Sequence, residues 1–316
     1  MDNRALKLLG SVNWGDIPPV NIYHEYLIEQ EHRWLTSLGM NQDSPVLDRY
    51  KKINVPLLAA MTHPCSTEEG LSIAHRFMSW LLILDDQFDE SSTTENYALL
   101  QAVLNNVKRV LAGEPVAEHS HAGLFRGLAD IWSDLARITS PHWQSRFTQH
   151  VIDFLNAYAW EYDNRRDNRV PSVEEYLTWR QATGAVLPCF DLLIPTLGIE
   201  LDELASSAHE LGILEFLACE IITLSNDLVS YHKEIKAQDF HNLVTIYTRN
   251  GFSTQSAMER VVQKIKLDIA EFDRVANLQL SVSPSVNLAR YISALKNWTT
   301  SNFYWSTVSA RYSLDS

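Results

Sequence analysis

The segment 84–90 (LDDQFDE) carries four carboxylates directly after an apolar stretch. On a helix, Asp85 and Asp89 share one face, and Asp86 lies beside them. Like charges at this spacing repel, so a bound cation would offset their cost. Clustered carboxylate oxygens suit Mg²⁺, which keeps several waters and commonly shares its coordination with substrate phosphates. The segment therefore indicates a magnesium site, and a solvated acidic helix end is the alternative.

A second polar segment, 226–234 (NDLVSYHKE), follows another apolar run. Asn226, Ser230 and Glu234 are four residues apart and would form one stripe on a helix. Amide, hydroxyl and carboxylate oxygens together make a hard-cation site of low charge. Lys233 lies near this stripe and offers a point charge to a phosphate group. The alternative is an ordinary polar helix face, but two such segments in one chain favour a shared metal and phosphate site.

These two segments resemble the metal-binding motifs of class I terpene synthases (terpene cyclases) of the microbial single-domain type. Segment 85–90 matches the aspartate-rich motif of that family, DDxxD/E. Asn226, Ser230, Lys233 and Glu234 match the second motif, NDxxSxxKE. The order of the two motifs and their separation along the chain are those of the family.

Two further matches extend the resemblance over nearly the whole chain. Arg180 stands where the family places the arginine that senses diphosphate, and Thr183 and Gly184 occupy the family's linker and effector positions. Arg311 and Tyr312 stand near the end of the chain, where the family has an Arg-Tyr pair. The resemblance implies that these five residues take part in catalysis.

The resemblance also implies the cofactor and the reaction. Three Mg²⁺ ions are expected with diphosphate bound, and Mn²⁺ is a substitute. The expected metal ligands are Asp85, Asp86, Asp89, Asn226, Ser230 and Glu234, and the expected diphosphate ligands are Arg180, Lys233, Arg311 and Tyr312. The expected enzyme ionises a linear prenyl diphosphate and cyclises the carbocation to a terpene hydrocarbon or alcohol. C15 farnesyl diphosphate is the first substrate expected, and C20 geranylgeranyl diphosphate, which would make a diterpene synthase, is the second.

A carbocation must be shielded from water, and aromatic faces stabilise cations through their quadrupoles. Plain core packing is the alternative for each aromatic residue. Leu81 and Leu82 occupy positions where relatives often have phenylalanine, which leaves the shape of the pocket open. The expected pocket residues are Phe77, Trp80, Leu81, Leu82, Phe88, Trp298 and Trp305.

Two other classes of protein remain as alternatives. A chain-elongating prenyltransferase would need a second aspartate-rich motif where this chain has Asn226, Ser230 and Glu234. A non-catalytic helical binding protein would leave the matches at Arg180 and Arg311 as coincidence.

Composition narrows the class further. The chain has 316 residues, 46% of them hydrophobic, and a formal net charge of −13. This charge disfavours nucleic-acid binding, which needs a basic surface. Three separated cysteines (Cys65, Cys189 and Cys219) are expected to be reduced core residues, and no signal-type or membrane-spanning apolar run is found. We expect a cytoplasmic protein without a membrane span, and the resemblance allows a homodimer.

The elements that must position these residues are helical, because apolar residues recur at helical spacing and no strand series is found. We expect one domain over 1–316, with an irregular segment at 1–19 and a tail at 311–316. Thr67 opens the helix of the first motif, and Ser172 caps the helix of Arg180. Gly184, Pro188 and Pro195 interrupt the next apolar region. The second motif lies on a helix over 200–232, followed by a polar loop from Lys233, and the last helix begins at Pro284 and carries Trp298, Trp305, Arg311 and Tyr312. The predicted fold class is all-α, the helical bundle of the class I terpenoid synthases around a central apolar cavity.

Overall fold

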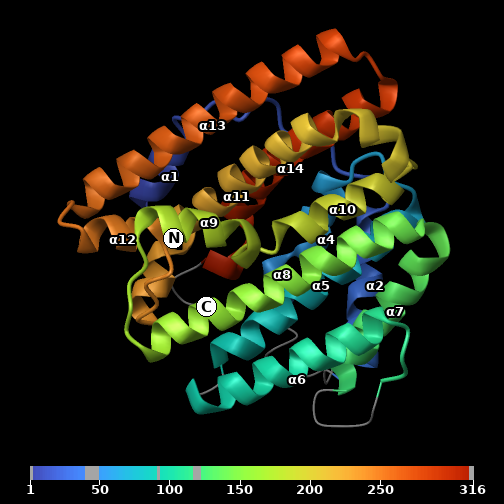
Figure 1. Cartoon of the computed structure of the whole chain (residues 1–316), viewed down its shortest axis with the longest axis horizontal. Helices are drawn as coiled ribbons and strands as arrows, with labels where there is room; N and C mark the ends of the chain where they lie inside the picture. The colour runs from blue at the N-terminus through green and yellow to red at the C-terminus, as the bar shows by residue number, and fades with distance from the viewer. Residues whose placement is uncertain (1–2, 40–49, 91–92, 117–121, 313–316) are drawn as a thin grey trace. The chain divides into compact units, whose positions relative to one another are not determined.

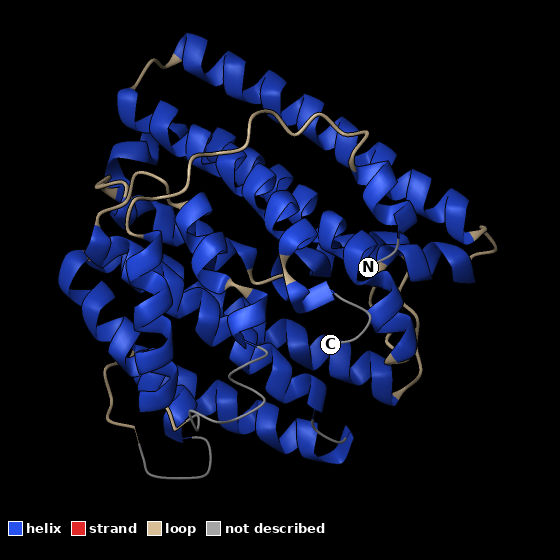
Figure 2. Ribbon diagram, turned by 180° about the vertical axis from the view of Figure 1, so that it is seen from behind, coloured by secondary structure: helices blue, strands red, loops and turns tan. Residues whose placement is uncertain are grey.

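A computed structural model describes residues 3–39, 50–90, 93–116 and 122–312, and within these ranges every regular element is a helix (Figure 1). Figure 2 shows the same chain from behind, with helices joined by loops. The all-α prediction is confirmed for the described residues. The α-helices are α1 (Asn3–Leu9), α2 (His24–Ser37), α4 (Val55–Thr62), α5 (Glu68–Glu90), α6 (Thr93–Leu111), α7 (Ala122–Ile138), α8 (Pro141–Arg166), α9 (Val173–Thr183), α10 (Val186–Thr196), α11 (Ala208–Lys236), α12 (Leu243–Arg249), α13 (Thr254–Val282) and α14 (Val286–Val308). Two 3₁₀ helices, η1 (Leu201–Ser207) and η2 (Ala310–Tyr312), complete the list.

Packing divides the chain into two compact units. Unit 1 is formed by Met1–Pro18, Asn164–Leu187 and Asp202–Ser316, and unit 2 by Pro19–Asp163 and Pro188–Leu201. The first acidic segment therefore belongs to unit 2, and the second polar segment belongs to unit 1. The expectation of a single domain over residues 1–316 stays a prediction.

Unit 2 holds α5 in place through its aromatic residues. Phe77 and Trp80 are fully buried, and the ring of Phe77 lies 5.1 Å from that of Phe147 on α8. The indole nitrogen of Trp80 donates to the carbonyl of Leu124 on α7 over 2.9 Å. A buried indole N–H needs such a partner. These contacts fix the helix whose last turns carry Asp85 and Asp86.

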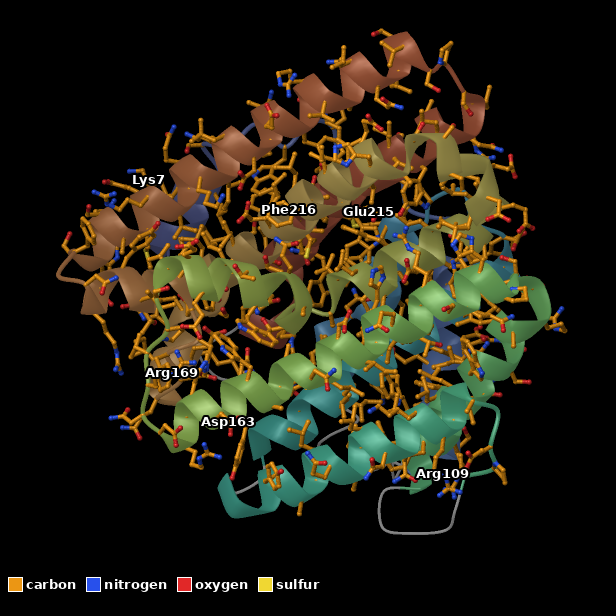
Figure 3. All side chains as sticks on the ribbon, viewed as in Figure 1. Lys7, Arg109, Asp163, Arg169, Glu215 and Phe216 are labelled. Atoms are coloured by element: carbon orange, nitrogen blue, oxygen red, sulfur yellow. The ribbon has the colours of Figure 1, made fainter. Side chains whose placement is uncertain are left out.

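Unit 1 is built on α11, which packs against α9, α12, α13 and α14. Side chains of adjacent residues on α11 have different surroundings, and Glu215 and Phe216, labelled in Figure 3, are an example. Glu215 is buried and accepts a hydrogen bond from the phenol of Tyr291 over 2.6 Å, whereas Phe216 is 46% exposed. Buried positions predominate over the length of the helix, so α11 is the core of unit 1.

The structure corrects the predicted limits of the second-motif helix. It was expected over 200–232, but 201–207 is the 3₁₀ helix η1 and α11 continues to Lys236. Lys233 and Glu234 therefore lie on the helix and not in the following loop. The last turn is closed by the loop itself, because the amides of Ala237 and Asp239 donate to the carbonyls of Lys233 and Glu234 over 3.0 and 2.9 Å.

Both ends of the chain also differ from expectation. The N-terminal segment predicted to be irregular contains α1. The last helix ends at Val308, and Arg311 and Tyr312 lie on η2. Residues 313–316 of the predicted tail lie outside the described residues.

The N-terminal cap of α9 is confirmed. The hydroxyl of Ser172 accepts a hydrogen bond from the backbone N–H of Glu175 over 3.1 Å. This hydrogen bond satisfies one of the backbone donors that every helix leaves unpaired at its first turn. The start of the helix that bears Arg180 is thereby fixed.

The three cysteines are free, and Cys189 and Cys219 are buried as expected, but Cys65 is exposed and so is not a core residue. Among the described residues, no single helix is long and apolar enough to cross a membrane. One bent pair of helical stretches, Val173–Thr196 with Leu201–Lys236, meets the same test by length and composition alone.

Candidate active site

The first acidic segment is oriented by tyrosines of unit 2. Tyr158 on α8 donates its phenol to Oδ1 of Asp85 over 2.6 Å, and Tyr50 donates to Oδ2 of Asp86 over 2.9 Å. Asp86 is buried, whereas Asp85 is partly exposed. Each carboxylate is thus oriented by a hydrogen bond from a tyrosine phenol. The side chains of Phe88 and Asp89 lie outside the described residues.

In the second polar segment, the side chain of Asn226 contacts two residues that are far from it in the sequence. Oδ1 of Asn226 accepts a hydrogen bond from Nη2 of Arg180 over 2.8 Å. Nδ2 of Asn226 donates to the phenol oxygen of Tyr312 over 2.8 Å. Ser230, one turn further along α11, donates to the carbonyl of Asn226 over 2.7 Å. The expected metal ligand Asn226 therefore lies between two of the expected diphosphate ligands.

Arg180 is further held by α11. Nη2 lies 2.8 Å from Oδ1 of Asp227, a residue with no exposed surface, and donates to the carbonyl of Thr223 over 3.4 Å. Nη1 donates to the hydroxyl of Thr183 over 3.3 Å, so the predicted linker residue contacts the predicted sensor. A buried ion pair of this kind is costly to break, because the remaining partner keeps an uncompensated charge.

Asp227 is the centre of a network that sequence reasoning left without a role. Oδ2 of Asp227 accepts from the phenol of Tyr176 over 2.8 Å and from the backbone N–H of Leu243 over 2.9 Å. Burial raises the pKa of this carboxyl, and the charge of Arg180 opposes the rise. The sequence signal that could have marked Asp227 as a site residue was its place in the second motif, directly after Asn226. Nothing in the sequence pointed to the contact with Tyr176.

Glu234 ends the stripe as a partly buried carboxyl. Oε2 accepts from Nδ2 of Asn242 over 2.7 Å. Burial raises the pKa of Glu234 to about 8, and the charge of Asp227 adds to the rise. A cation would hold this carboxyl in its charged form, so the residues present fit a divalent metal.

The other predicted metal ligands on this stripe are the side-chain oxygens of Asn226 and Ser230. No group of three or more His, Cys, Asp or Glu side chains placed to hold a metal ion is found among the described residues. The ligands predicted on the α11 stripe are one amide oxygen, one hydroxyl oxygen and one carboxylate. Lys233 and Arg311 are both partly buried in this unit.

The predicted helix break is present at Gly184, beside Arg180, but Pro188 and Pro195 lie within α10 and do not interrupt it. Gly184 ends α9, and Ala185 adopts the left-handed conformation with φ of 53°. A Cβ atom on Gly184 would lie only 2.3 Å from Cγ2 of Thr223. The close approach of α9 to α11 therefore requires a glycine at this position.

The expected pocket residues fall into two groups. Phe77, Trp80 and Leu81 are buried in unit 2 and Leu82 is partly exposed. In unit 1, Trp298 and Trp305 are buried, and the Trp305 ring lies 6.0 Å from that of Tyr312 in an edge-to-face arrangement. Their role in lining a substrate pocket stays a prediction.

Both ring nitrogens of His241 have polar partners. The side chain is buried, Nδ1 lies 2.7 Å from Oδ1 of Asp239, and Nε2 lies 3.2 Å from the amide nitrogen of Asn164. Sequence reasoning missed Asn242, Tyr158 and Tyr50, because single tyrosines and asparagines carry no spacing signal.

Comparison with known proteins shows the family of the chain. Residues 76–271 match the family model described as terpene synthase family 2, C-terminal metal binding. The (+)-T-muurolol synthase ((2E,6E)-farnesyl diphosphate cyclizing) of Roseiflexus castenholzii is 32% identical over 88% of this chain and 86% of its own length. The germacrene A synthase of Nostoc punctiforme is 26% identical over 92% of this chain and 91% of its own length.

Solved structures show the same fold at low identity. A cucumene synthase variant superimposes with a TM-score of 0.82 at 22% identity, covering 96% of this chain and 99% of that one. A linalool/nerolidol synthase from Streptomyces clavuligerus, in complex with 2-fluorogeranyl diphosphate, superimposes with a TM-score of 0.81 at 20% identity, covering 91% of this chain and 100% of that one.

Proposed function

The chain belongs to the terpene synthases, and from this premise we propose that it is a magnesium-dependent class I cyclase that converts (2E,6E)-farnesyl diphosphate to a sesquiterpene hydrocarbon or alcohol. The observation that carries the proposal is the position of Asn226 between Arg180 and Tyr312, because it joins a hard-cation ligand to two donors for diphosphate oxygens. The named relatives that act on farnesyl diphosphate favour the C15 substrate over the C20 one.

Two sets of side-chain oxygens are proposed as metal ligands. In unit 2 these are the carboxylates of Asp85, Asp86 and Asp89. In unit 1 they are the side-chain oxygens of Asn226, Ser230 and Glu234. We propose three Mg²⁺ ions with diphosphate bound, which would neutralise charge on the leaving diphosphate.

Four side chains would bind the diphosphate, namely Arg180, Lys233, Arg311 and Tyr312. The guanidinium of Arg180 presents a planar fork that can donate two parallel hydrogen bonds to phosphate oxygens. Lys233 adds a point charge from the same face of α11 as the metal ligands. Donors fixed before the reaction stabilise the charge that develops on the leaving group without reorganising.

Trp298 and Trp305 are the aromatic faces that unit 1 would offer to the carbocation. Both are buried, so the surroundings of each ring exclude water. Phe77 and Trp80 are proposed as further aromatic pocket residues, with Leu81 and Leu82 as aliphatic ones. An aromatic quadrupole stabilises a nearby cation by about 0.5–2 kcal/mol.

The test is a product assay with C10, C15 and C20 prenyl diphosphates, each with and without Mg²⁺, followed by gas chromatography–mass spectrometry. We expect a cyclic C15 product that forms only with metal. A cyclic product from the C20 substrate alone would move the protein to the diterpene synthases. Longer prenyl diphosphates after addition of isopentenyl diphosphate would assign chain elongation instead. No product from any substrate would overturn the proposal, and the Asn226→Ala variant serves as the preparation control.

A further inference from the structure

The loop between α11 and α12, residues 237–242, folds back along the turn of α11 that carries Glu234. The amide of Asp239 donates to the carbonyl of Glu234 over 2.9 Å. Gln238 adopts the left-handed conformation with φ of 58°, which reverses the direction of the chain. The loop therefore begins and ends beside the last predicted metal ligand.

Asn242 closes this loop with a side chain that uses every hydrogen-bonding position it has. It has no exposed surface. Nδ2 donates to Oε2 of Glu234 and to the carbonyl of Asp227, both over 2.7 Å. Oδ1 accepts from the backbone N–H groups of Val244 and Thr245, over 2.9 and 3.4 Å, and so caps α12. Since two acceptors face Nδ2 and two donors face Oδ1, the orientation of the amide is fixed.

Asn242 at the end of the loop and Leu243 at the start of α12 hold Asp227 from two sides. Asn242 binds the carbonyl of Asp227, and the backbone N–H of Leu243 binds the Asp227 carboxylate over 2.9 Å. Asp227 in turn lies against Arg180 and Tyr176. One short loop thus contacts both Glu234 and Asp227, the residue that pairs with the guanidinium of Arg180.

The loop is itself anchored to α8 and α9. His241 contacts Asp239 over 2.7 Å and Asn164 over 3.2 Å, and its carbonyl accepts from the phenol of Tyr176 over 3.2 Å. Arg165 pairs with Asp239 over 3.0 Å. A loop with this many buried contacts is a rigid support for the side chain that it presents.

We propose that Asn242 is a positioning residue for the metal site of unit 1. Its Nδ2 holds the Glu234 carboxylate in place before a metal ion binds, so the ion meets an ordered ligand. The inference rests on the proposed function, since it assigns a support to a ligand of that same site. Residues that orient a metal ligand without touching the ion typically change metal affinity by about 10–100-fold.

Asn242→Asp tests the role of the Nδ2 donor, because it replaces the NH₂ group of the side chain by an oxygen. Aspartate caps a helix as well as asparagine does, and the shape is unchanged. The N–H donor is lost, an oxygen then faces Oε2 of Glu234, and a negative charge is added, which the neutral Asn242→Ser variant does not add. The matched control is Asn277→Asp, the same change at an exposed position of α13.

The measurement is the Mg²⁺ concentration that gives half of the maximal thermal shift at saturating inorganic diphosphate. We expect that concentration to rise about 10–100-fold in Asn242→Asp and to stay unchanged in Asn277→Asp. Far-UV circular dichroism of the metal-free proteins checks that the helices are retained. Asn242→Ser, which keeps a short neutral cap but cannot reach both partners, should also raise the concentration and replaces Asn242→Asp should that variant not fold.

The outcomes separate this inference from the proposed function. If the wild-type protein shows no thermal shift, the proposed metal site itself is wrong, and this inference fails with it. If the wild-type protein shifts and both Asn242 variants need no more Mg²⁺ than it does, the positioning role is overturned. A lower melting temperature with unchanged Mg²⁺ dependence would also overturn it, because it would show a purely structural role.

Discussion

The amide oxygen of Asn226 accepts a hydrogen bond from Arg180 over 2.8 Å, so an expected metal ligand and an expected diphosphate ligand contact each other without either ligand present. A metal ion on that oxygen and a diphosphate on that guanidinium would each compete with the same hydrogen bond. Binding of one should therefore ease binding of the other, which is a coupling between two ligands at one site.

The first prediction follows from this coupling. Mg²⁺ and diphosphate added together should raise the melting temperature by more than the sum of the shifts that each produces alone. Ligand at 100 times its dissociation constant stabilises the folded state by about 2.7 kcal/mol. The measurement is differential scanning fluorimetry with each ligand separately and with both. Strictly additive shifts would contradict the coupling, and Na⁺ in place of Mg²⁺ is the control.

Removing a ligand of the stripe should abolish turnover. Asn226→Ala and Glu234→Ala are each expected to lower kcat/KM at least about 100-fold, because a cation loses one of few ligands. The circular dichroism spectrum should stay that of the wild-type protein. The control is Glu271→Ala, which removes an exposed carboxylate paired with Arg274 on α13. Full activity in either stripe variant would remove the metal role of that residue.

Arg180→Lys should not behave as a conservative change. A lysine cannot contact Asn226, Asp227 and Thr183 at once, as the guanidinium does. Loss of one fixed donor to a developing charge costs roughly 10²–10³-fold in kcat. Steady-state kinetics provide the measurement, and exposed Arg274→Lys on α13 provides the control. Wild-type kcat in Arg180→Lys would contradict the role of the planar fork.

The contact between Gly184 and Thr223 predicts a compensating pair. Gly184→Ala should destabilise unit 1 by about 1–3 kcal/mol, since its Cβ would collide with Cγ2 of Thr223. Thr223→Ser removes that methyl group and keeps the hydroxyl that donates to the backbone carbonyl of Cys219 over 2.9 Å. Urea unfolding of the two single variants and the double variant should show that the double variant recovers much of the loss. Simple additivity would refute a direct clash.

A cluster of three charged residues, Glu220 on α11 with Lys264 and Asp268 on α13, predicts that stability depends on pH. Lys264 lies 2.8 Å from Glu220 and 3.3 Å from Asp268. Burial, reinforced by the charge of Glu220, raises the pKa of Asp268 to about 7. The folded state therefore keeps a proton on Asp268 that the unfolded state releases near pH 4, so stability falls as pH rises from about 4 to about 7.

Asp268→Asn tests this pH dependence. The variant should match the wild-type protein near pH 4 and be more stable above pH 7, by on the order of 1 kcal/mol or more. The measurement is the free energy of unfolding in urea at pH 5, 6, 7 and 8. Asp273→Asn, which removes a half-exposed carboxylate on the same helix, should change stability by under about 1 kcal/mol at each pH. A constant difference between Asp268→Asn and the wild-type protein across this range would rule out the assignment.

The sequence by itself determined which residues share a helix face. The spacing of Asn226, Ser230 and Glu234 predicted one stripe, although the helix end predicted at residue 232 left Glu234 in the loop. Ser172 was enough to start the helix that bears Arg180. Helical periodicity and caps act over a few residues, so they can be read directly from the chain. The family resemblance rests on these same local patterns.

Only the tertiary structure decided what holds these residues in place. The end of α11 was predicted too early, because its last turn is closed by the loop that returns to it. The contacts of Asp227 with Tyr176, and of Asp85 with Tyr158, join segments far apart in the chain. No local spacing encodes such pairs, because they form only when packing of apolar faces brings distant helices together and leaves buried polar groups that must find partners.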